Sequence, residues 1–474
     1  MAVKLRRPIL MGGIGLSFGL WILQSLHHSI AQLGFGVFGA IALGTGFWLF
    51  RPGIKNVIPA DDSPLDRATV EKAIAVAEGA ISQLVVEAQN HPANLALQQR
   101  LAQLTVELNR QEIHLSVTGG KAVGKTTLIK VLSGWTAEIQ PPLHWKETPA
   151  LFAIDTSNTS EMASALASDL VLFVTNGDLT DSEFQTLQYL AAANQRLVLV
   201  FNQQDQYLPE ERAIVLHTLQ QRMSTIGAEN VVVGVATSPN PIKVRQHQPD
   251  GFVQEWLESS APQTKLLTDY LTQIIAQESQ QLVWATTKRK AVALKQEAKT
   301  VLNGVRRDRT LPIIEQYQWI AAAAAFANPV PALDLLATAA VNAQLVTELG
   351  AIYQQKFSLQ QAQAIAATMG NLMLKLGLVE LSTQTISSFL KSNAITFVAG
   401  GALQGVSAAY LTRLAGMSLI EYLQQDTTTD ETQRPLNLDQ LKQTIQKTFQ
   451  QNQQVAFLQS FVNTISQKLI PKMS

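Results

Sequence analysis

The chain has 474 residues, of which 46% are hydrophobic and 15% are charged, against about 25% charged in an average soluble protein. This composition excludes an intrinsically disordered protein and disfavours a wholly soluble enzyme, since few charges are available to cover its surface. Lys plus Arg and Asp plus Glu number 36 each, and this balance disfavours a dedicated nucleic-acid binder, which needs a basic excess. Without cysteine, disulfides, thiolate zinc sites, iron–sulfur clusters and cysteine nucleophiles are excluded.

The first 55 residues predict a transmembrane helical hairpin. Residues 8–26 and 29–50 carry no formal charge, and each run has about the 20 residues needed to cross a bilayer. Positive flanks stay in the cytoplasm, so we expect a multi-pass membrane protein with the bulk of the chain facing the cytoplasm. A cleaved signal peptide and a buried soluble hairpin are the alternatives. The basic flanking residues are Lys4, Arg6, Arg7, Arg51 and Lys55.

A helical stalk or linker is predicted for residues 56–110, and the rhythm then changes to short apolar strands alternating with helices. This alternation predicts an α/β domain over residues 111–260, with a parallel-dominated sheet and helices on both faces. A long basic connecting helix (261–310), an all-α hydrophobic domain (311–425), and a linker with a C-terminal amphipathic helix (426–474) are expected to follow. The predicted strands are 113–118, 151–154, 170–175, 197–201 and 231–236.

Residues 119–126 satisfy the pattern G-x-x-x-x-G-K-[ST], with a predicted strand before them and a helix after them. Glycines in such a loop let backbone N–H groups surround phosphate oxygens at a helix N-terminus. The Lys125 ammonium would reach the β- and γ-phosphates, and the Thr126 hydroxyl would hold Mg²⁺. The predicted nucleotide contacts here are Gly119, Gly120, Lys121, Ala122, Val123, Gly124, Lys125, Thr126 and Thr127.

Asp155 follows the predicted strand 151–154, where P-loop proteins place a carboxylate that assists Mg²⁺ binding. Thr126 and Asp155 are therefore the predicted metal ligands. Residues 155–158 resemble the D-x-x-G switch of GTPases, with Asn158 in place of the glycine.

A second motif, Asn202-Gln203-Gln204-Asp205, follows another predicted strand and resembles the N-K-x-D guanine motif of Ras-like GTPases. In that resemblance the Asp205 carboxylate accepts hydrogen bonds from guanine N1–H and the 2-amino group, which adenine cannot offer. Asn202 would tie the loop to the P-loop, and Gln203 stands in place of the family lysine. Ala236, after the last strand, lies where the family's S-A-x loop would touch the base.

Residues 111–260 thus resemble an Era/Ras-like P-loop GTPase domain, which implies GTP/GDP and Mg²⁺ as ligands. The Mg²⁺-sensing threonine of switch I is left open between Thr136 and Thr148, and no water-positioning Gln or His follows Asp155. We therefore expect slow or absent intrinsic hydrolysis, and no catalytic residue is named.

Residues 312–425 resemble the YcjF-like domain of unknown function, a hydrophobic helical domain found fused to bacterial Era-like GTPases. Residues 328–337, 400–404 and 412–416 carry this resemblance, which implies a GTPase-linked, membrane-associated module. Residues 394–420 are apolar but contain Gln404 and Arg413. A charge within a span costs about 2.5–3.5 kcal/mol on insertion scales, which favours buried or interfacial packing over a true span.

Between Lys288 and Arg309 lie eight basic and two acidic residues. This basic cluster is open to two interpretations, contact with anionic lipid headgroups or a solvated helix face.

The leading interpretation is a membrane-anchored GTP-binding protein whose nucleotide state is coupled to the helical module. Its expected partners are membrane lipids and further copies of the chain, and no nucleic acid. A pseudo-GTPase membrane scaffold and an ATP-dependent membrane enzyme are the alternatives.

Overall fold

The computed structural model describes residues 65–136, 139–151, 159–227, 231–247, 253–327, 331–392, 400–425 and 437–452, with residues 460 and 464. It divides into two compact units: the first includes Ile113–Gln277, and the second combines Ser63–Glu112 with Glu278–Ser474. The predicted transmembrane hairpin, Asp155 and Asn158 lie outside the described residues, so the structure does not test them.

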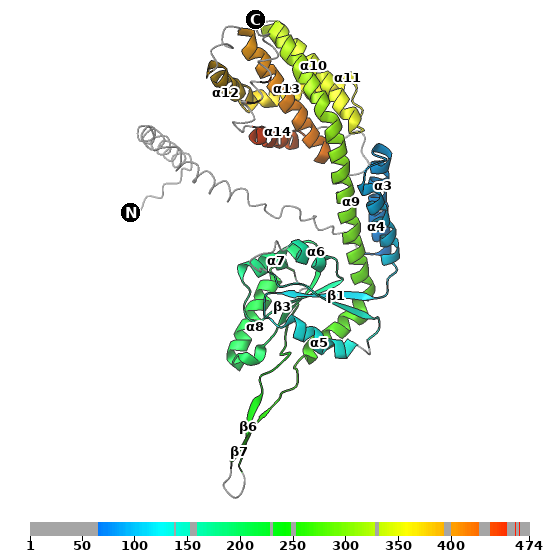
Figure 1. The fold of residues 1–474 in the computed structure, drawn as a ribbon, viewed down its shortest axis with the longest axis vertical. Coiled ribbons are helices and arrows are strands. Elements are labelled where there is room, and N and C mark those ends of the chain that lie inside the picture. The colour runs from blue at the N-terminus through cyan, green and yellow to red at the C-terminus, as the bar shows by residue number, and fades with distance from the viewer. Residues whose placement is uncertain are drawn as a thin grey trace, which may run out of the picture. The chain divides into compact units, whose positions relative to one another are not determined.

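A five-stranded sheet forms the centre of the first unit, and all of its strand pairs are parallel. The order is β2-β1-β3-β4-β5, and Figure 1 shows it with its helices. The prediction of a parallel α/β domain followed by a helical region is confirmed. The strands are β1 (Ile113–Gly119), β2 (Leu143–Glu147), β3 (Leu170–Thr175), β4 (Arg196–Phe201) and β5 (Val231–Gly234).

Helices cover both faces of this sheet, because alternate residues on its central strands are buried on either side. Phe173 and Phe201 pack with apolar residues of the helices that follow β2, β3 and β4. Leu172 and Val200, which point to the other face, are also fully buried. The helices of this unit are α5 (Lys125–Thr136), α6 (Thr159–Leu166), α7 (Asp181–Ala192) and α8 (Pro209–Ser224), with a 3₁₀ turn η2 (Gln204–Gln206).

The second strand of the sheet is one that the sequence did not predict. Leu151 lies in a turn, residues 152–154 are outside the described chain, and β2 is formed earlier, by Leu143–Glu147. This strand is at the edge of the sheet and alternates between half-buried and exposed residues. It therefore lacks the continuous apolar run that marks a central parallel strand.

A hairpin that the sequence analysis did not predict lies between β5 and α9. Its strands β6 (Ile242–His247) and β7 (Val253–Glu258) pair antiparallel with each other. Every residue of β7 is exposed, including Trp256 and Leu257.

In the second unit, the predicted stalk is a pair of helices packed on a third. The helices α3 (Arg67–Glu87) and α4 (Ala93–Glu107) lie beside α9 (Lys265–Ala327), as Figure 1 shows. Ile81, Leu97 and Leu294 are among the buried residues that they share. The helix α9 continues beyond residue 310, where the predicted connecting helix ended.

A buried ion pair joins these helices. Arg306 of α9 is 1% exposed, and its Nε and Nη2 donate to Glu87 of α3 at 3.0 and 2.6 Å. Gln354 Nε2 also donates to Glu87, at 2.8 Å, and the Arg306 guanidinium lies 5.4 Å from the centre of the Tyr353 ring. Two hydrogen bonds and a charge partner compensate a guanidinium that has lost its water.

The basic cluster is thus not one solvated face. Arg306 is buried, Arg309 donates to the backbone oxygen of Glu87, and Lys290 pairs with Glu107 at 3.1 Å. These three side chains contact other residues of the unit. Fewer of the eight basic side chains are therefore free to contact lipid headgroups.

Five further helices surround the largest apolar core, to which the last turns of α9 also contribute. Val406, Ala409 and Leu414 of the fourth of these helices are buried there, so this part of the predicted segment 394–420 packs inside the unit. The helices are α10 (Pro331–Ile352), α11 (Leu359–Lys375), α12 (Leu378–Ser392), α13 (Gly400–Gln425) and α14 (Leu438–Asn452).

No single helix in the described ranges has the length and hydropathy of a membrane span. The helix α11 and residues Leu378–Gln384 reach that hydropathy together, across a bend of 68°.

We predict that Arg306→Met lowers the thermal unfolding midpoint of the full chain markedly, because it leaves the Glu87 carboxylate buried without its partner. Breaking such a pair costs about 3–5 kcal/mol. The exposed neighbour Arg307 provides a matched control, since Arg307→Met should change the midpoint little. Circular dichroism melting measures both, and equal effects would contradict the assignment of Arg306 as a buried, paired charge.

A second prediction concerns pH. Burial, with a smaller contribution from Lys295, lowers the pKa of Lys299 from 10.5 to about 8. The unfolded chain therefore binds more protons at this residue between these two pH values, so its contribution to stability rises with pH there and is least favourable below pH 8. Lys299→Met should raise the melting temperature at pH 7, and the gain should shrink by pH 10. An equal gain at both pH values would show that the lowered pKa of Lys299 is not the cause.

Candidate functional site

Three residues in or beside the loop between β1 and α5 have a positive φ, which favours glycine. Gly119 has φ +143° and Gly124 has φ +91°, and Ala122 is also in the left-handed region at φ 62°. A Cβ on Gly119 would lie 2.2 Å from the backbone oxygen of Val174, in the neighbouring strand. Gly119 is therefore required by a close approach to the neighbouring strand, and Gly124 by its positive φ and by the Asn202 amide, 2.2 Å from where its Cβ would lie.

Lys125 is folded into this loop. Its Nζ donates to the backbone oxygens of Gly119 and Gly120, at 3.2 and 2.7 Å, and the residue is 7% exposed. Burial lowers the pKa of Lys125, and the negative charge of Glu147 acts in the opposite direction. A partly desolvated ammonium ion held by loop carbonyls is suited to receiving an anion with strong charge complementarity.

The carboxylate that the structure brings to Thr126 is Glu147. The Thr126 hydroxyl lies 2.8 and 2.9 Å from the two oxygens of Glu147, the last residue of β2. The sequence analysis assigned this role to Asp155, which is outside the described residues. The available signal was Glu147-Thr148-Pro149-Ala150, a D-x-x-G pattern with Glu for Asp and Ala for Gly.

Neither candidate for the switch threonine fits that role in this structure. Thr136 ends α5, and at about 1.5 Å per residue it lies about 15 Å along the helix from Thr126. Thr148 is 1% exposed, and its hydroxyl lies 3.4 Å from the backbone oxygen of Val117.

Asn202 joins the predicted base-binding loop to the phosphate loop. Its Nδ2 donates to the backbone oxygen of Val123 at 2.9 Å, and its Oδ1 accepts from the backbone N–H and the hydroxyl of Thr237, both at 3.1 Å. The side chain is completely buried. The carboxyl ends of β1, β4 and β5 are thereby linked by one amide group.

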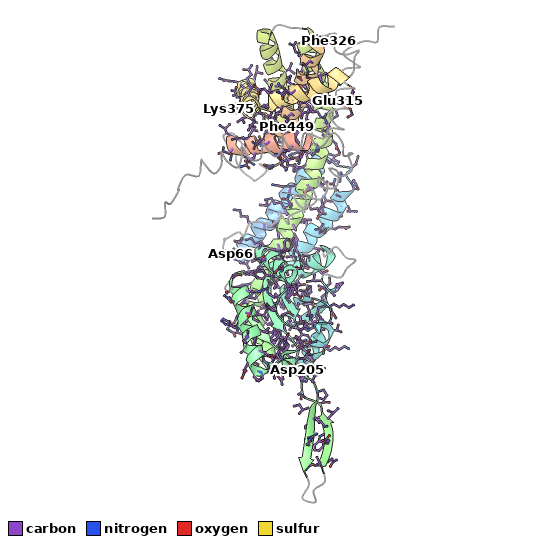
Figure 2. All side chains as sticks on the ribbon, turned by 90° about the vertical axis from the view of Figure 1, so that its left-hand side faces the viewer. Asp66, Asp205, Glu315, Phe326, Lys375 and Phe449 are labelled. Atoms are coloured by element: carbon purple, nitrogen blue, oxygen red, sulfur yellow. The ribbon has the colours of Figure 1, made fainter. Side chains whose placement is uncertain are left out.

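Gln203 and Asp205, the other two motif residues that bear on base recognition, follow Asn202 in the same loop. Gln203 has φ 59°, and its Nε2 donates to the backbone oxygen of Ala122 at 3.4 Å. Asp205 is half-buried and accepts the backbone N–H of Asn240 at 3.1 Å. Figure 2 marks Asp205 above the base of the β6–β7 hairpin.

Ala236 is buried, and its backbone N–H donates to the oxygen of Gln263 at 3.1 Å. In this loop it is Thr237, one residue later, that contacts Asn202. Of the remaining predicted contacts, Lys121 and Ala122 are exposed, Val123 is buried, and Gly120 and Thr127 are half-buried. Their roles toward a nucleotide stay predictions.

The donor set around Thr126 fits magnesium better than a transition metal. Mg²⁺ usually takes one or two protein oxygens together with phosphates and water, and Thr126 with Glu147 offers such oxygens. Across the described ranges, no group of three or more His, Cys, Asp or Glu side chains could hold a metal ion by itself.

Residues 289–454 match the family described as a domain of unknown function, DUF697. No curated protein matches the chain.

Many solved structures are similar to parts of the chain, and three of them are the following. The LeoA bacterial dynamin GTPase from ETEC is 12% identical over 85% of this chain and 94% of its own, with a TM-score of 0.30. An oligomerised bacterial dynamin pair, described as sensing and tethering membranes, is 9% identical over 86% and 78%, with a TM-score of 0.25. The translation elongation factor SelB from Methanococcus maripaludis is 18% identical over 27% and 30%, with a TM-score of 0.23. These TM-scores are too low to support a functional conclusion.

We predict that Gly124→Ala lowers the unfolding midpoint, because its Cβ would lie 2.2 Å from Asn202 Nδ2 in a backbone of φ +91°. Residues held in such regions of φ/ψ space cost about 1–3 kcal/mol. Gly134, within α5, has no atom within 4 Å of an added Cβ. Gly134→Ala is the matched control and should stabilise by up to about 1 kcal/mol. Thermal unfolding of both variants distinguishes a required glycine from a tolerated one.

Proposed function

We propose that this chain is a membrane-anchored guanine-nucleotide-binding protein, in which nucleotide occupancy is coupled to the DUF697 module. The observation that carries the proposal is the Asn202 amide, which binds the phosphate loop at Val123 and the loop after β5 at Thr237. This arrangement lets one ligand engage a phosphate-binding loop and a base-binding loop together.

Four side chains have roles in holding such a ligand. Lys125 would exchange its carbonyl partners for phosphate oxygens, and the glycine-lined loop would surround those oxygens with backbone N–H groups. Thr126 and Glu147 would hold Mg²⁺, which when bound neutralises charge on the β- and γ-phosphates. Asp205 would select guanine through two hydrogen bonds that adenine does not offer.

We also propose that intrinsic hydrolysis is slow. After Glu147-Thr148-Pro149-Ala150 comes Leu151, which is buried and has no polar group in its side chain. GTPases that turn over efficiently use a side chain such as glutamine to orient the attacking water.

A pseudo-GTPase membrane scaffold remains the second candidate. The observations that favour it are the replacements of the family's motif residues by Glu147, Ala150 and Gln203. In that case nucleotide would be absent or purely structural, and the two candidates differ in the binding experiment below.

Anchoring by residues 1–55, with the bulk of the chain on the cytoplasmic side, belongs to the same proposal. It rests on the two uncharged runs and their basic flanks. Self-association through the helical regions is likewise proposed.

Binding of a fluorescent GTP analogue to the full chain in the presence of Mg²⁺, with GTP, GDP and ATP as competitors, tests the nucleotide proposal. We expect guanine nucleotides to compete at least about 100-fold better than ATP, since a site built to pair with the base rejects a ligand lacking that pairing. Asp205→Ala should reduce this preference to less than tenfold. Glu147→Gln should weaken the dependence of binding on Mg²⁺.

Lys125→Ala should lower the affinity at least tenfold, whereas Lys130→Ala, an exposed lysine of α5, should leave it unchanged. Absence of binding by the folded wild type would refute the proposal in favour of the scaffold. Hydrolysis faster than about 1 s⁻¹ without a partner would refute slow turnover, since intrinsic GTPases without their activators turn over far below that rate.

A further inference from the structure

The second unit contains a cavity of about 340 Å³ between α10, α11 and α13. Its volume lies within the range of about 300–1,000 Å³ that is usual for small-molecule sites. Buried side chains such as Leu345, Met373 and Leu419 form part of its wall. The cavity is independent of the predicted nucleotide site, which is in the first unit.

One face of α11 borders the mouth of this cavity. Ala367, Gly370, Asn371 and Leu374 all contribute to the lining and are all exposed. Their spacing of three and four residues places them on a single side of the helix. Leu374 is 59% exposed, one residue before Lys375, which Figure 2 labels. The cavity is therefore reached from the surface through an apolar rim.

The lining carries no charged side chain, and its polar side chains are the amides of Asn342 and Asn371. The Oδ1 atom of Asn342 is buried and has no hydrogen-bond partner among the described residues. An amide oxygen left in this way costs free energy that a ligand with a hydroxyl group could recover. The orphaned acceptor indicates that the site takes a ligand with one polar group and a large apolar part.

We propose that this cavity binds a single-chain amphiphile, whose alkyl chain fills the apolar space and whose hydroxyl pairs with Asn342. A methylene is close in size to a water molecule, whose share of liquid volume is about 30 Å³, so about eleven methylenes fill the cavity. This proposal assigns a class of ligand to the region that matches DUF697, and it goes beyond the proposed nucleotide function.

The lining favours an alkyl chain over a peptide segment as the occupant. A peptide brings backbone N–H and C=O groups that must be paired when buried, and two side-chain amides are few partners for them. An alkyl chain brings no polar group along its length. Its burial is favourable by the hydrophobic effect alone, and the single hydroxyl meets the single orphaned acceptor.

The experiment uses the full chain in membranes of the expression host and a dodecanol analogue with a photoactivatable diazirine in its alkyl chain. After illumination, mass spectrometry locates the labelled residues. We expect labels on α10, α11 and α13, and we expect unlabelled 1-dodecanol to suppress them. Methyl dodecyl ether, which cannot donate a hydrogen bond, should compete about fivefold less well.

Gly370→Leu is the blocking variant, because nothing lies within 4 Å of a Cβ at this position and the new side chain would enter the cavity. A leucine in the helix interior also has a higher helix propensity than glycine, so we expect folding to be preserved. Labelling of the cavity should fall at least tenfold. Gly304→Leu, at an exposed helical glycine of α9 with equally open surroundings, should leave labelling unchanged.

A third variant isolates the polar contact. Asn342→Leu should keep the alkyl chain bound and abolish the preference for dodecanol over its methyl ether. Equal labelling in Gly370→Leu and the wild type would overturn the proposal, as would labels confined to helices outside the cavity. Absence of labelling in the wild type would overturn it too. Lys125→Ala should not alter the labelling, which separates this site from the nucleotide proposal.

Discussion

The buried guanidinium of Arg306 has lost its hydrating water, and neighbouring groups of the second unit must replace the interactions that water would make. The Glu87 carboxylate of α3 pairs with this guanidinium, and the ring of Tyr353, directly after α10, lies against it. A charge buried at this point ties the stalk helices to the helical core. This pair adds to the apolar side chains that α3, α4 and α9 bury between them. The stalk and the core are therefore parts of one unit.

In the first unit, the parallel sheet has the corresponding organising role. Because all five strands run in one direction, their carboxyl ends lie at one edge, where the loops of a doubly wound sheet gather their functional residues. The phosphate loop follows β1, Glu147 ends β2, Asn202 follows β4 and Thr237 follows β5. The direction of the strands brings residues that are distant in sequence to this edge, and the hydrogen bonds of Asn202 and Glu147 then join their loops.

The sequence predicted the parts of the structure that have strong local signals. The strands β1, β3, β4 and β5 were found because their apolar runs are nearly continuous, as burial on both faces requires. The phosphate loop was found because its glycines satisfy a local backbone requirement. Asn202 was correctly expected to contact the phosphate loop, because residues 202–205 resemble the N-K-x-D motif in which the asparagine has that role.

The features that were missed depend on tertiary context. The edge strand β2 mixes Trp145 with Lys146 and Glu147, and its one-sided burial resembles a loop. Glu147 was overlooked with it, whereas Asp155, the predicted metal ligand, lies outside the described residues and stays a prediction. The burial of Arg306 could not be predicted from a run of basic residues. It depends on where α3 packs, because Glu87 of α3 is the partner that makes burial of this arginine possible.

Gly124 and Asn202 share one small volume, since the amide of Asn202 occupies the space that a side chain at position 124 would need. Asn202 in turn holds Val123 and Thr237. Among related chains, any replacement of the glycine should therefore coincide with a shorter residue at position 202 and an altered one at position 237. Covariation of these three positions would be the evolutionary trace of a steric constraint that couples two loops of the site.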